Sequence, residues 1–140
     1  MPVSYAIRPE LGVMVALFHG SVTVEHIRDA FMDYQQHPDF DGRYSVLMDQ
    51  AECSFPVGCY DDYRQLAYRL RPHYAARHPS SRTAFFAPGD IAYGMSRMYK
   101  AIAEESAGFS IEVFRTAGEA LRFVGVDPLA HGAATLLRPG

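Results

Sequence analysis

Lysine and cysteine are scarce in this sequence. Lys100 is the one lysine among 13 basic residues, and we attribute the excess of arginine to genomic base composition. The cysteines, Cys53 and Cys59, have a Cys-x5-Cys spacing. That spacing fits neither the Cys-x2-Cys pattern of zinc sites nor a redox Cys-x-x-Cys. We therefore expect two reduced thiols, no metal site and no cofactor.

Long apolar runs are also absent. The longest run, Val13–Phe18, is far shorter than the roughly 20 residues that span a bilayer. The N-terminus has no basic region followed by an apolar one, as a secretory signal would have. These absences predict a cytoplasmic protein without a membrane span.

The composition is that of a globular protein of one domain. Hydrophobic residues make up 49% and charged residues 21% of the 140 residues, and the formal net charge is −3. A near-neutral chain has no overall field that would attract nucleic acid. Five arginines lie between Arg64 and Arg82, but the acidic residues before them favour a solvated helix face. We predict one domain over residues 1–124 and a loosely packed tail over residues 125–140.

Hydrophobic periodicity predicts strands that alternate with helices. The order is β-β-α-β-α-β-α-β-α, which indicates an α/β fold with a mixed five-stranded sheet and about four helices. Thr23 and Thr116 are favourable helix N-caps. The predicted strands are residues 3–8, 13–19, 44–49, 83–87 and 111–114, and the predicted helices begin near residues 23, 61, 90 and 116.

Several residues are expected to interrupt or end these elements. Residues 50–59 are predicted to form a loop, and Pro72 to end or kink the second helix. Asp90 is expected to cap the third helix, and Gly108 to end it in a left-handed conformation. The inward stripe of that helix is predicted to be Ile91, Met95, Met98 and Ile102.

Four local motifs accompany this order of elements. Residues 20–25 read Gly-Ser-Val-Thr-Val-Glu before the first helix, and residues 47–49 read Leu-Met-Asp at the end of a strand. Residues 93–99 read Tyr-Gly-Met-Ser-Arg-Met-Tyr, and residues 112–115 read Glu-Val-Phe-Arg before a Glu-Ala pair. Together the motifs resemble the STAS fold of anti-sigma-factor antagonists and its SpoIIAA-like relatives. The resemblance covers residues 3–124 and implies that fold.

One motif of the signalling STAS members is missing. Those members carry Asp-Ser/Thr-Ser/Thr-Gly after the third strand, where a partner kinase phosphorylates the hydroxyl. Here residues 49–54 read Asp-Gln-Ala-Glu-Cys-Ser. No hydroxyl directly follows Asp49, and Ser54 does not match the position. The resemblance therefore implies the fold without an evident phosphorylation switch.

A first functional hypothesis is a non-catalytic regulatory or protein-binding module. It would use the loop over residues 49–62 and the turn over residues 88–93 to contact a protein partner or a second copy of the chain. Its predicted surface residues are Asp49, Gln50, Ser54, Phe55, Tyr60, Asp62, Gly89, Asp90, Tyr93 and Arg97.

Two other hypotheses remain open. SpoIIAA-like domains are similar in fold to the lipid-carrying SEC14 domains, which implies that a small apolar ligand is a candidate. Its pocket would be lined by Phe55, Tyr60, Met95 and Met98, although helical spacing favours core packing for the two methionines. An enzyme would need Asp49, Asp90 and Arg97 to converge on one cleft. The sequence favours a non-catalytic protein, with the ligand carrier or sensor as the alternative.

Overall fold

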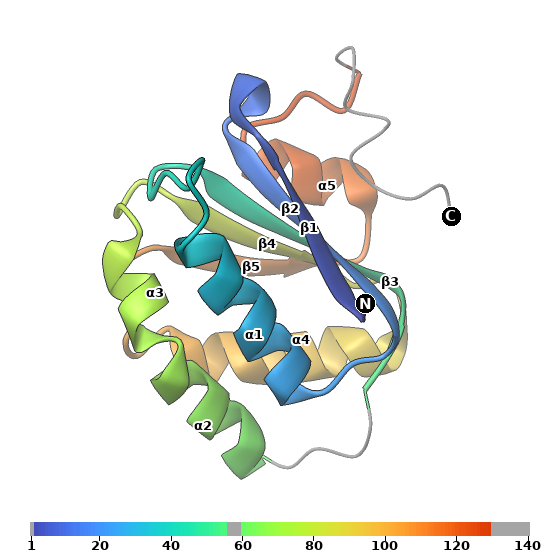
Figure 1. The fold of residues 1–140 in the computed structure, drawn as a ribbon. Helices are drawn as coiled ribbons and strands as arrows, with labels where there is room; N and C mark the ends of the chain where they lie inside the picture. Colours follow the sequence, from blue (N-terminus) through green and yellow to red (C-terminus); the bar gives the residue numbers. More distant parts are fainter. Residues whose placement is uncertain (1, 56–59, 130–140) are drawn as a thin grey trace.

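The five strands form one mixed sheet whose order follows the sequence. The computed structural model describes residues 2–55 and 60–129. The first two strands are antiparallel, and every later neighbouring pair is parallel. This is the sheet that the sequence predicts (Figure 1). The strands are β1 (Val3–Arg8), β2 (Val13–Ser21), β3 (Ser45–Ser54), β4 (Arg82–Phe86) and β5 (Ser110–Phe114).

Five α-helices lie along the described chain, one more than the sequence predicts. A short 3₁₀-helix, Pro9–Leu11, joins the first two strands, and Gly12 closes that turn with a left-handed φ of 67°. Among the described residues, no helix has the length and apolar character needed to cross a membrane. The α-helices are α1 (Val24–Gln35), α2 (Tyr60–Arg69), α3 (Arg71–Ala76), α4 (Asp90–Ala103) and α5 (Ala117–Phe123).

The order of the strands explains why the helices are distributed unequally over the sheet. Each connection from β2 to β5 moves one strand further in the same direction. Because such crossovers are almost always right-handed, successive helices that advance in one direction lie on the same face. α1, α2, α3 and α4 cover that face, and α5 covers the other (Figure 1).

Two hydrophobic clusters result, one on each face of the sheet. Side chains alternate along β3, so that Val46 and Met48 belong to the large cluster under α1 to α4, whereas Leu47 packs toward α5. The smaller cluster also contains Val126, which is 3% exposed. Packing therefore continues past residue 124, where the sequence places the end of the domain. Residues 130–140 of the predicted tail lie outside the described residues.

The ends of several elements differ from the predictions. β2 continues past residue 19, its predicted end, to Ser21, and β3 continues past residue 49, its predicted end, to Ser54. Pairing with the end of β2 stabilises this extension, which sequence periodicity does not reveal. Residues 50–54 are thus strand instead of loop, and residues 56–59 of the predicted loop lie outside the described residues.

The second predicted helix ends before Pro72, and a further short helix begins there. α2 ends at Arg69, and Pro72 lies in the first turn of α3. A proline is tolerated there because the N–H groups of a first turn have no partner within the helix. His73 is therefore helical, because the chain stays helical past Pro72 as far as Ala76.

The predicted details of α4 are partly wrong. Gly89 is its N-cap, and Asp90 is the first helical residue. Gly108 does not have a positive φ, so it does not end the helix in a left-handed conformation. Ile91 is 74% exposed and does not belong to the inward stripe. Ile102 is buried as predicted, and Met95 and Met98 are partly buried against the large cluster. The buried residues of the helix are Ala92, Ser96, Tyr99, Ile102 and Ala103.

The backbone of Gly42 lies against the end of α3. Its carbonyl accepts a hydrogen bond from the His78 amide at 2.8 Å. A Cβ on Gly42 would lie 2.2 Å from the carbonyl oxygen of Ala76, which is backbone and cannot rotate away. The absence of a side chain at this position thus fixes how α3 meets the start of β3.

We expect Gly42→Ala to lower the free energy of unfolding by about 1–3 kcal/mol, because the added methyl forces the two backbone segments apart. Urea denaturation measures this change. Gly94→Ala is the matched control, since nothing lies within 4 Å of its added methyl and Gly94 is inside α4. Alanine there should stabilise the protein by up to about 1 kcal/mol. Equal effects of the two substitutions would contradict the close approach.

Candidate functional site

A cavity lies between the sheet and the helices that cover its larger cluster. Residues of β3, β4, α2, α3 and α4 contribute to its wall. Its volume is about 40 Å³, measured as the space in which the centre of a water molecule can lie. This space admits about three waters or one slender group. The wall is mainly apolar, and its polar or charged members besides tyrosines are Gln50, His73, Arg77, Thr83 and Ser96.

Gln50 and Ser96 form a buried polar contact in this wall. The Ser96 hydroxyl donates a hydrogen bond to Oε1 of Gln50 at 2.6 Å, and both residues are buried. The bond joins β3 to the inward face of α4. It gives the site a polar group at the end of the sheet where the parallel strands terminate.

Arg77 is the charged residue of the cavity wall. It lies directly after α3 and is 7% exposed. Its Nε and Nη2 donate to the Ser81 hydroxyl at 3.1 and 2.5 Å, and its guanidinium carbon lies 3.9 Å from the ring centroid of Phe109. Ser81 in turn donates to the carbonyl of Tyr44 at 2.9 Å. These contacts anchor the cation between α3, β3 and β4.

No carboxylate of the described chain forms an ion pair with Arg77. Burial lowers the pKa of Arg77 to about 10, so that the guanidinium stays protonated at neutral pH. A buried cation without an opposite charge is unfavourable, because hydrogen bonds to neutral groups replace only part of its hydration.

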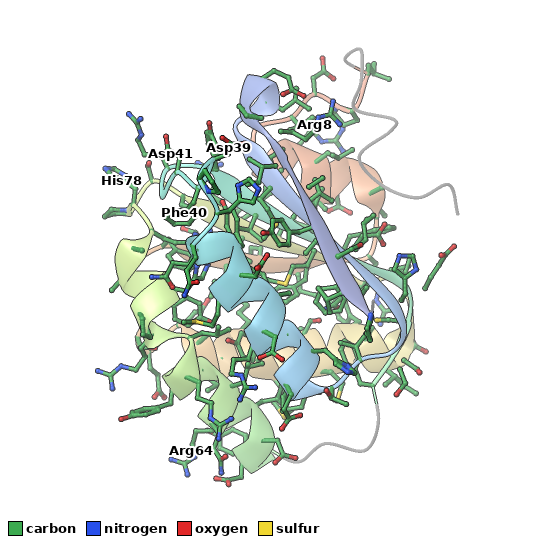
Figure 2. The ribbon with its side chains drawn as sticks, viewed as in Figure 1. Arg8, Asp39, Phe40, Asp41, Arg64 and His78 are labelled. Atoms are coloured by element: carbon green, nitrogen blue, oxygen red, sulfur yellow. The ribbon has the colours of Figure 1, made fainter. Side chains whose placement is uncertain are left out.

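His73 lies one helical turn before Arg77 and is fully buried. Aromatic rings surround it: Phe31 at 5.3 Å, Tyr34 at 5.8 Å and Phe40 at 6.2 Å between centroids. Phe40 follows the end of α1 and lies in the same region of the molecule as His78 (Figure 2). Burial, and then the charge of Arg77, lower the pKa of His73 to about 3. The imidazole is therefore neutral at neutral pH.

Several buried polar atoms around Arg77 have no hydrogen-bond partner. They are both ring nitrogens of His73, the hydroxyl of Tyr34 and the hydroxyl of Thr83. His73 and Thr83 belong to the cavity wall, and Tyr34 contacts the His73 ring. Unsatisfied buried groups are rare in folded proteins. Their concentration beside an uncompensated cation distinguishes this part of the molecule from ordinary core.

Two tyrosines complete the wall between α3 and α4. The hydroxyls of Tyr74 and Tyr99 are hydrogen-bonded to each other. Burial raises the pKa of both hydroxyls, that of Tyr74 to about 12. Both groups are therefore neutral, and they supply no negative charge to Arg77.

The structure brings only some of the predicted site residues into the cavity. Gln50 and Phe55 line it, as does Met95, which was predicted to line an apolar pocket. Tyr60 and Met98 do not line it: Tyr60 is the first residue of α2 and is 58% exposed, and Met98 packs against the large cluster. Ser54, Asp62 and Gly89 are exposed.

Asp49 lies on the opposite face of the sheet from Gln50. It pairs with Leu17, which packs toward α5, and side chains of paired strand residues point to the same face. Asp49 is completely buried, and its Oδ1 accepts the amide of Ala51 at 3.0 Å. It does not line the cavity. Asp49 was predicted to end a strand, but it lies inside the longer strand β3.

The remaining predicted residues gather outside the cavity, at the start of α4. Asp90 forms an ion pair with Arg115 at 2.7 Å. Arg115 and Arg97 both lie over the ring of Tyr93, at 4.2 and 5.7 Å from its centroid. The catalytic arrangement of Asp49, Asp90 and Arg97 is not assembled, because the first is enclosed and the other two are exposed.

Sequence reasoning missed the principal polar residues of the cavity. Arg77 is one of the five arginines expected on a solvated helix face, Thr83 is predicted only as the start of a strand, and His73 fits no recognised motif. The available signal was the spacing of four residues between His73 and Arg77, which places both on one side of a helix. Pro72 obscured this signal because it suggested that the helix had ended.

Comparisons with known proteins support the fold. No family model matches the chain, and no curated protein matches it. It is similar to the solved structure of an uncharacterized protein of the DUF3478 family with a SpoIIAA-like fold, from Shewanella loihica PV-4. The match has a TM-score of 0.52 and 14% identity, and it covers 87% of this chain and 91% of that one. The chain therefore has a SpoIIAA-like fold, as its motifs predict, and the match carries no information about function.

The buried neutral histidine predicts a loss of stability in acid. Above pH 6.5 the group is neutral in both the folded and the unfolded chain, so it adds no pH dependence. Below that pH the unfolded chain binds a proton that folded His73 does not bind until about pH 3. Stability should thus fall by about 1.4 kcal/mol per pH unit between about pH 6 and 4 because of this group.

Urea denaturation over this pH range tests the assignment to His73. The substitution His73→Phe should reduce the slope of the unfolding free energy against pH by about 1.4 kcal/mol per pH unit, the value for one proton. His19→Phe changes an exposed position of β2 and should leave this slope as in the wild type. An unchanged slope in His73→Phe would show that the histidine is protonated when folded.

Proposed function

We propose that this protein is a non-catalytic carrier or sensor that binds one small, partly apolar molecule between the sheet and α2, α3 and α4. The observation that carries the proposal is the cavity, in which a mainly apolar wall contains a few convergent polar groups. Small-molecule sites generally combine these two features, because apolar surface supplies affinity and polar groups fix orientation.

The chemistry of the wall favours binding over catalysis. The hydroxyls of Tyr74 and Tyr99 are neutral, and so is His73. Asp49 faces the other side of the sheet. A general base needs a pKa near the working pH. The surroundings do not shift the pKa of any group in the described wall to that range. The cavity is therefore suited to hold a molecule without changing it.

Native mass spectrometry of the purified, untagged chain tests whether a molecule is bound. We expect a mass above that of the chain, which disappears under denaturing conditions. A chain-only mass would be followed by thermal denaturation with unbranched alcohols of increasing length. A ligand at a hundredfold excess over its Kd should raise the Tm by roughly 5–10 °C.

The variant Met95→Trp should abolish this binding, because the larger side chain fills the cavity wall. Ile91→Trp is the control, since Ile91 lies on the same helix and is 74% exposed. If no added mass and no rise in Tm is found with the wild type, or if both variants behave like it, the cavity does not bind a ligand.

The protein-binding module predicted from the sequence is a second candidate, supported by the exposed start of α4. Ile91 is a large apolar residue 74% exposed beside the charged and aromatic cluster of Asp90, Tyr93 and Arg115. Such a patch is suited to a contact with a second copy of the chain, because an apolar centre surrounded by polar groups is typical of interfaces.

Sedimentation velocity over a range of protein concentrations tests this second candidate. We expect a dimer that Ile91→Asp converts to monomer and that Tyr68→Asp, at an exposed position of α2, leaves intact. A wild type that is monomeric at every concentration would remove self-association as a function of this surface.

A further inference from the structure

We propose that the molecule bound in the cavity is a carboxylate with a slender apolar body, and that its head group lies against Arg77, His73 and Thr83. This inference rests on the proposed function, since it names the class of ligand for the same cavity. It goes beyond that function because a purely apolar ligand would leave the charge of Arg77 uncompensated and the polar atoms of His73 and Thr83 without partners.

The first argument is the charge of Arg77. The guanidinium is buried, is held by Ser81 and Phe109, and has no acidic partner in the described chain. Its hydrogen bonds use Nε and Nη2, and none is formed by Nη1 among the described residues. A bound anion would supply the missing charge and accept from this remaining nitrogen.

The second argument is the set of unsatisfied atoms beside that charge. His73 is fully buried and Thr83 is 3% exposed, and the ring nitrogens of the first and the hydroxyl of the second lack partners. Both residues line the cavity with Arg77. A carboxylate has two oxygens that can accept bonds from all three residues. Water in the same place would satisfy hydrogen bonds but would leave the cation without an opposite charge.

The number of cations decides the charge of the head group. Arg77 is the one cationic residue in the described wall, because His73 is neutral. A single guanidinium compensates one negative charge, which favours a carboxylate over a phosphate that carries about two charges near neutral pH. The planar arrangement of carboxylate oxygens also matches the planar donors of arginine.

The rest of the cavity sets the shape of the ligand. Thr83 pairs with Val46, which precedes Gln50 by four residues along β3. The head-group site and Gln50 are therefore separated by about 13 Å at 3.3 Å per strand residue. Apolar side chains, including Met48, Phe85 and Leu66, line the wall. A cavity volume of only about 40 Å³, room for about three waters, limits the ligand to a short unbranched acid and excludes a long chain or a ring system.

Isothermal titration with propionate and with propan-1-ol tests the inference at pH 7.5, where the acid is ionised. The two probes share the same short chain and differ in the head group. We expect wild-type protein to bind propionate roughly 10- to 100-fold more tightly than the alcohol. Arg77→Met should reduce propionate affinity to that of the alcohol.

Two controls separate a loss of the head-group contact from a loss of the fold. Arg71→Met removes an exposed arginine at the start of α3 and should keep the preference for propionate. The ligand-free Tm of Arg77→Met should not fall, because the substitution removes a buried charge that the chain itself does not compensate. Continued binding of propan-1-ol by this variant also shows that its cavity is intact.

The outcomes distinguish the two proposals. Equal affinity of the wild type for propionate and the alcohol overturns the carboxylate assignment and leaves the ligand-binding function standing. Failure of both probes to bind counts against the cavity as a ligand site and therefore against both proposals. A propionate preference that survives Arg77→Met places the head group elsewhere and overturns the assignment to Arg77.

Discussion

The unidirectional order of the strands is the constraint on which the site depends. Each right-handed crossover places its helix on the same face, so that four helices share one side of a sheet that α5 alone covers on the other. α2 and α3 both belong to the crossover from β3 to β4, and they form two separate helices instead of one continuous helix. The cavity lies between this layer of helices and the sheet, and side chains of several helices and strands line it.

Within that layer, the exclusion of water that stabilises the core makes the buried polar groups of the cavity unfavourable. Aromatic rings around His73 keep water out, and they also keep the imidazole neutral. The same exclusion of water makes the charge of Arg77 unfavourable until an anion is present. A molecule that binds here with an opposite charge therefore gains more than it would at the surface, because the low-dielectric surroundings strengthen the pairing.

The sequence contains enough information for the fold and much less for the site. The periodicity of apolar residues identifies every strand of the sheet, because burial of apolar side chains sets this pattern. Spacing alone does not distinguish Ile91, which is exposed, from Ala92, which is buried. His73 and Arg77 escaped detection for another reason: polar residues are read as solvent-exposed by default, and only tertiary packing shows which of them are enclosed.

Arg77 also gives this fold a feature that selection for stability alone would not retain. A neutral side chain of similar length would relieve the unpaired charge, and the arginine would drift to other residues in a lineage that had no use for it. Its retention or loss among divergent chains of this fold would thus record their history. On the carboxylate proposal, chains that keep the arginine would have kept the ligand, and chains that replaced it would have kept only the scaffold.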